Sequence, residues 1–126
     1  MSGLFSRRRW RFRTGKLALA ASSSPAMKVT LLLNTALLAM FYAAWCCVDY
    51  RLVHSPQYPQ NIADGDWILT LIPTVTFATN FVVYRGQGLR KALFAAILAS
   101  VALCVLFLVV LVLFGLSFHL SIGGRI

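Results

Sequence analysis

The run from Ala92 to Phe118 constrains the fold more than any other part of the sequence, because it contains no charged residue. A helix needs about 20 mostly apolar residues to cross the hydrocarbon core of a bilayer. A chain of 126 residues is too short to surround such a helix with protein on all sides. The run therefore predicts a membrane-spanning helix. Small residues at every fourth position of its first half indicate close packing against another helix: Ala92, Ala96 and Ser100.

Two further stretches, at about residues 28–48 and 67–84, are also long and apolar enough to span. The first carries Asn34, Tyr42 and Asp49 on one helical stripe. In the second, four residues share one side of a helical wheel: Thr70, Pro73, Thr76 and Asn80. Lipid cannot satisfy polar groups, whereas neighbouring helices can. Both stripes are therefore predicted to face protein, and Pro73 is expected to kink its helix.

The distribution of Lys and Arg predicts the orientation, because loops rich in these residues stay on the cytoplasmic or matrix side. Basic residues crowd the segment before the first span and recur at 85–91, but they are sparse at 49–66 and after the third span. We therefore predict an all-α integral membrane protein with three transmembrane helices, at about 28–48, 67–84 and 92–118. Its N-terminus is inside and its C-terminus outside, and the second and third helices form an antiparallel hairpin.

Residues 1–26 are predicted to form a basic arm on the cytoplasmic side, followed by a membrane domain at 27–126. The arm is expected to bind anionic lipid headgroups through Arg7, Arg8, Arg9, Arg11, Arg13 and Lys16. The alternatives are an organelle transit peptide, a twin-arginine signal and a nucleic-acid-binding arm. So short an arm beside a membrane span favours lipid, and no nucleic-acid partner is predicted.

The ionisable residues do not form a recognisable catalytic set, since three Asp, two His and three Cys are dispersed among different segments. We therefore expect no enzymatic activity and no small-molecule substrate. Asp66 is predicted to cap the helix that follows it, and Asp49 is able to pair with Arg51 at the membrane surface. A metal site in which His54 joins the loop aspartates is a weaker alternative, and neither a metal nor another cofactor is predicted.

Gly115 and His119 carry one further alternative. A small residue one turn before a histidine leaves room for a tetrapyrrole ring whose metal the histidine ligates, and Leu116-Ser117-Phe118-His119-Leu120 resembles the pigment-ligating stretch of light-harvesting antenna helices. The resemblance implies haem or chlorophyll bound at His119. The competing interpretation is a histidine that is hydrogen-bonded at the membrane interface.

The leading hypothesis is a small non-catalytic subunit, or an assembly or stabilising factor, of a larger complex in a bacterial or organelle inner membrane. Its partners would be other integral-membrane subunits, with anionic lipid at the arm. A holin-like pore-former or transporter component is the second hypothesis, and the tetrapyrrole carrier is the third.

Overall fold

The computed structural model describes residues 25–126, and every regular element in that range is helical. Three helical segments are long and apolar enough to cross a membrane: α2 (Pro25–Val53), Ile62–Gln87 and Leu89–Ser121. The chain divides into two units, residues 1–32 and 33–126. In the described part of the first unit, the Thr30 hydroxyl donates to the Ala26 carbonyl at 2.8 Å. All contacts that follow lie within residues 33–126.

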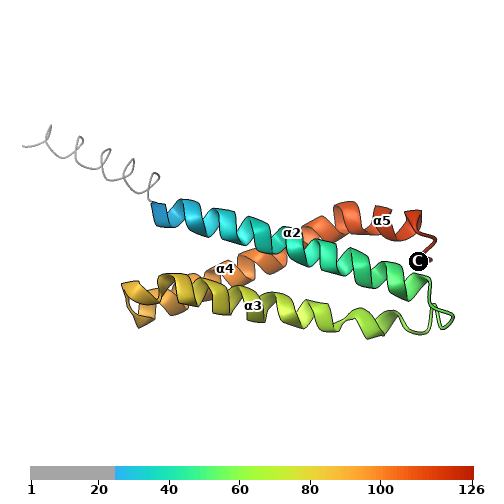
Figure 1. Cartoon of the computed structure of the whole chain (residues 1–126), viewed down its shortest axis with the longest axis horizontal. Coiled ribbons are helices and arrows are strands. Elements are labelled where there is room, and N and C mark those ends of the chain that lie inside the picture. The colour runs from blue at the N-terminus through green and yellow to red at the C-terminus, as the bar shows by residue number, and fades with distance from the viewer. Residues whose placement is uncertain (1–24) are drawn as a thin grey trace, which may run out of the picture. The chain divides into compact units, whose positions relative to one another are not determined.

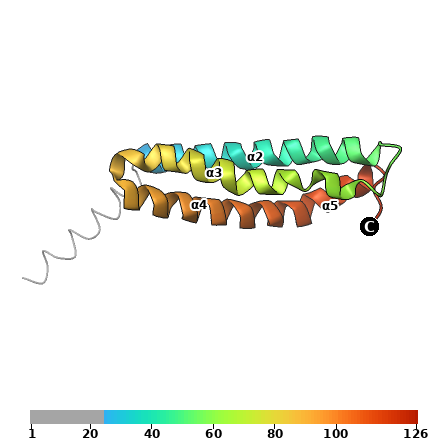
Figure 2. The ribbon, with the colours of Figure 1, turned by 90° about the horizontal axis from the view of Figure 1, so that it is seen from below.

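α3 (Trp67–Tyr84) and α4 (Leu89–Val110) form an antiparallel hairpin, and Figure 2 shows the two helices side by side. A short 3₁₀ turn, η2 (Arg85–Gln87), joins them, and Gly88 follows with a φ of 107°, which favours glycine. Ala92 and Ala96 of α4 are completely buried, so the two backbones approach closely. The predicted second and third helices thus form a hairpin with a glycine at its turn.

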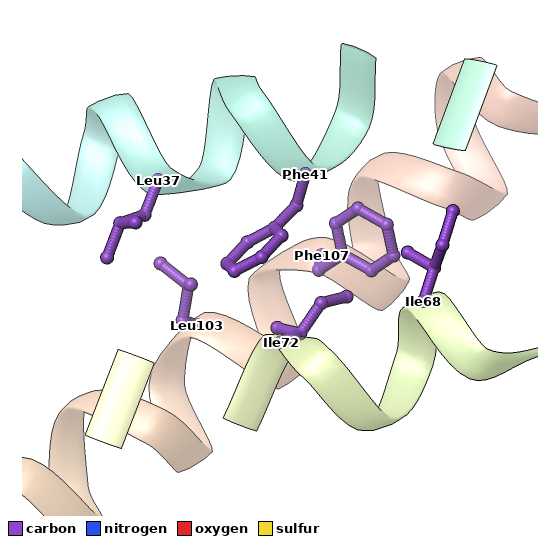
Figure 3. Close-up of a cluster of buried hydrophobic side chains, with 6 residues drawn as sticks. All are labelled: Leu37, Phe41, Ile68, Ile72, Leu103 and Phe107. Atoms are coloured by element: carbon purple, nitrogen blue, oxygen red, sulfur yellow. The ribbon is translucent and has the colours of Figure 1, made fainter. Parts of the chain in front are cut away.

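The helices share a core of six apolar side chains, two from each helix (Figure 3). These are Leu37 and Phe41 of α2, Ile68 and Ile72 of α3, and Leu103 and Phe107 of α4. The backbone of α2 makes few close approaches to the hairpin, whereas α3 and α4 are in extensive backbone contact. α2 is therefore attached to the hairpin mainly through side chains.

A π-helical turn, η3 (Leu111–Gly115), interrupts the last long helix and leads into α5 (Leu116–Ser121). A π-turn accommodates one more residue than an α-helical turn, so it shifts the faces of the residues that follow. The inward positions step from Ser100 to Leu103 and Phe107, as helical periodicity requires. The next inward positions are Gly115, the last residue of the π-turn, and His119 in α5.

The long helices extend beyond two of the predicted spans. α2 begins three residues before 28 and ends five residues after 48, and the last helical segment covers 89–121 rather than 92–118. The bounds of α3 coincide with the predicted 67–84. Asp66 occupies the N-cap position of α3, but its side chain makes no capping hydrogen bond, so this part of the prediction is wrong.

Candidate functional site

A polar contact joins α2 to α5 at the end of the unit that carries the 54–66 loop (Figure 1). His119 Nδ1 lies 2.8 Å from Oδ1 and 3.0 Å from Oδ2 of Asp49. The two side chains are only 15% and 12% exposed, respectively. A buried carboxylate needs a hydrogen-bonding partner, and the imidazole supplies one.

The hydrogen bonds continue from His119 to the last residues of the chain. His119 Nε2 lies 3.3 Å from the Arg125 carbonyl oxygen. Tyr58, in the loop after α2, donates its hydroxyl to the same oxygen at 3.3 Å and accepts from the Arg125 N–H. Since both partners of the imidazole are acceptors, both ring nitrogens donate only in the imidazolium form. In that form, Asp49 and His119 are an ion pair.

The π-turn and Gly115 bring His119 to this position. A Cβ placed on Gly115 would lie 3.2 and 3.3 Å from two ring carbons of Trp45, so only glycine admits the indole without adjustment. The same indole packs edge-on against Phe118, with ring centroids 6.4 Å apart. Trp45 of α2 thus packs against η3 and α5.

The Asp49–His119 pair borders a cavity of about 180 Å³. Four of its lining residues carry polar side chains, namely Asp49, Tyr58, Asp66 and His119. The remaining lining residues are mostly apolar: Trp45, Val48, Leu52, Ile62, Gly65 and Leu69. This arrangement can hold a small polar group next to the Asp49–His119 contact.

A second polar contact joins α2 to the hairpin farther along the unit. Asn34 Nδ2 donates to Asn80 Oδ1 at 3.0 Å, and Asn80 Nδ2 donates to Asn34 Oδ1 at 2.9 Å. Asn80 is completely buried and also donates to the Thr76 carbonyl at 2.9 Å. The two amides therefore form a reciprocal pair between helices, and Thr76, also fully buried, keeps a hydroxyl oxygen without a hydrogen-bond partner.

The other residues predicted for helix packing have different environments. Ser100 is buried against α3 and donates to the carbonyl oxygens of Ala96 at 2.8 Å and Pro73 at 3.4 Å. Tyr42 is half-buried and stacks on Trp45. Thr70 is exposed, away from the buried line of α3, and donates to the Trp67 carbonyl. The six basic residues of the arm lie outside the described residues.

The structure gives Asp49 a different partner from the one that its neighbours in the sequence offered. Asp49 pairs with His119 rather than with Arg51, which is exposed.

The described residues do not fit the metal and tetrapyrrole alternatives. Within residues 25–126, no group of three or more His, Cys, Asp or Glu side chains is arranged to hold a metal ion. His54 instead lies with Nδ1 2.9 Å from the Tyr50 carbonyl oxygen. For a tetrapyrrole, both His119 nitrogens already have partners, and Trp45 fills the space beside Gly115.

The sequence interpretation missed Tyr58 and the π-turn. Tyr58 lies 67 residues from its partner Arg125, and nothing in the local sequence indicates that pairing. Gly115 was the available signal for the π-turn region, but it was interpreted as space for a ring rather than for an indole from α2.

No protein-family model, curated protein or solved structure matches the chain.

Proposed function

We propose that this chain is a small non-catalytic integral-membrane subunit, or an assembly factor, of a larger inner-membrane complex. Three helices of sufficient length and apolarity support its location in a membrane. The sparse Lys and Arg at 49–66 and their recurrence at 85–91 support an orientation with the N-terminus inside and the C-terminus outside. The partner is another membrane-embedded protein.

The observation that carries the proposal is the exposed face of α2. Ala36, Ala43 and Cys47 are exposed. On a wheel of about 100° per residue they lie on the side of the helix away from Phe41 and Trp45. Small residues in a membrane helix allow a second helix to approach its backbone closely. This face is therefore suited to contact with a helix from another chain.

The exposed surface of α4 has a different composition. Large apolar side chains cover it, including Leu93, Phe94, Ile97, Leu98, Val101 and Val105. Such side chains match the hydrocarbon of lipid and hold neighbouring backbones apart. The contrast favours α2, rather than α4, as the partner-binding helix.

Photo-crosslinking in native membranes tests this assignment. A diazirine side chain in place of Met40, which is 61% exposed beside the small-residue face, is expected to capture a membrane protein. The same group in place of Val101 is expected to capture lipid. Ala43→Leu should abolish protein capture at position 40, and Ala102→Leu, also at an exposed alanine, should leave it intact. Capture of lipid alone at position 40 would refute the proposal.

The pore-forming alternative receives less support from the positions of the polar residues. A water-filled pore needs a polar lining, and the polar side chains Asn80, Thr76 and Ser100 are buried within the chain's own helices. Liposomes that contain only this protein are therefore expected to retain an encapsulated dye. Rapid leakage would favour the pore-former.

A further inference from the structure

An open apolar groove adjoins the cavity beside Asp49 and His119. The groove has a volume of about 400 Å³, and its lining consists of Trp45, Leu108, Leu111, Val112, Gly115, Leu116 and His119. Trp45 and His119 also line the polar cavity of about 180 Å³, so the two spaces meet at these side chains. Their volumes together fall within the range of about 300–1,000 Å³ that is typical of small-molecule sites.

We propose that the groove and cavity form one binding site for a single-chain amphiphile whose head donates hydrogen bonds and carries no negative charge. The aliphatic chain lies in the groove along η3, and the head enters the cavity beside Asp49. This site is separate from the small-residue face of α2, so it goes beyond the proposed function and does not depend on a protein partner.

The charged groups around the cavity favour a head group that has no negative charge. Asp49 and Asp66 contribute two carboxylates, and His119 neutralises one of them when it is protonated. Among the residues that line the cavity and the groove there is no Lys or Arg. A phosphate or carboxylate head would therefore meet unbalanced negative charge, whereas an amine or hydroxyl is able to donate to a carboxylate oxygen.

The groove suits an aliphatic chain because its lining is apolar except for the edge of His119. Leu108, Val112 and Leu116 are 56%, 70% and 47% exposed, so they present apolar surface that is accessible from the hydrocarbon of a bilayer. The indole of Trp45 lines both the groove and the cavity, and it combines an apolar ring body with a polar N–H.

Two diazirine-labelled probes of equal chain length, a primary amine and a carboxylate, test the proposal on the full chain in phosphatidylcholine nanodiscs. The measurement is the crosslinking of residues 108–116 relative to that of residues 93–101, the lipid-exposed part of α4 in the same molecule. We expect this ratio to be about tenfold higher for the amine, a difference that corresponds to ~1.4 kcal/mol of binding free energy. Asp49→Asn should reduce the preference for the amine.

A matched pair of substitutions distinguishes site filling from misfolding. Val112→Trp places a large ring in the groove and should remove the amine preference, whereas Val101→Trp, at another exposed valine, should not. The proposal is overturned if both probes give the same ratio, if the carboxylate is preferred, or if Val112→Trp leaves the amine preference intact. Loss of protein capture at position 40 would not bear on this result, so the two proposals fail separately.

Discussion

The reciprocal amide pair between Asn34 and Asn80 gives a sharp test of how α2 is held on the hairpin. Replacing Asn34 with Leu removes both interhelical hydrogen bonds and leaves the buried Asn80 with only its bond to the Thr76 carbonyl. A buried polar group that loses its partner costs about 1–3 kcal/mol. Asn80→Leu is expected to cost a similar amount, because it leaves the half-buried Asn34 amide without Asn80.

The double variant should be less damaging than the sum of the single ones, because both costs include the loss of the same two interhelical hydrogen bonds. Hydrogen bonds between membrane helices contribute about 0.6 kcal/mol on average, and at most about 1.7 kcal/mol. Two such bonds predict a coupling free energy of about 1–3 kcal/mol between positions 34 and 80.

Reversible unfolding in mixed micelles of a mild detergent and sodium dodecyl sulfate, followed by tryptophan fluorescence, would provide the four free energies. Thr74→Leu is a suitable control partner for Asn34→Leu, since Thr74 is exposed and donates to its own helix at the Thr70 carbonyl. That control cycle should be additive within about 0.5 kcal/mol. Equal coupling in both cycles, or additive costs at 34 and 80, would refute the reasoning.

Three further predictions concern packing and orientation. Gly115→Ala should destabilise the protein by about 1–3 kcal/mol in the same unfolding assay, because its Cβ would crowd the indole on α2, whereas Gly86→Ala, with nothing within 4 Å, should be neutral or slightly stabilising. Ala96→Leu should cost about 1–3 kcal/mol or more by separating α3 from α4, while the exposed Ala102→Leu should be tolerated. In a cysteine-free background, an impermeant thiol reagent applied from the outer face should label Ser55→Cys and spare Gly86→Cys; the opposite pattern would contradict the orientation.

The apolar runs were sufficient to predict three long helices and the hairpin, because span length and small-residue spacing are local properties of a sequence. Thr76 and Asn80 were predicted to face protein, and the structure buries both of them against this chain's own helices. The helical wheel identifies a polar stripe, but it contains no information about which helix covers that stripe. Thr70 illustrates the same limit, since the wheel groups it with the buried residues although it is exposed.

The polar network at the loop end could not be predicted from local sequence patterns, for a geometric reason. Its contacts depend on the π-turn, which advances the inward face of the helix just before His119. A run of similar Val, Leu and Phe side chains has no local feature that indicates where a helical turn contains one extra residue. Asp49 therefore appeared to have Arg51 as its nearest partner, when the partner is supplied 70 residues later.

The dependence of α2 on side-chain contacts has a consequence for biogenesis. A ribosome delivers Asn34 and Asp49 first, and their partners follow only 46 and 70 residues later. Until the hairpin has entered the bilayer, the leading helix carries an amide and a carboxylate whose interhelical partners, Asn80 and His119, are not yet in place. The fold is thus complete only after the last helix has been synthesised. A nascent chain stalled before that point would expose polar groups that quality-control proteases or insertion chaperones are able to recognise.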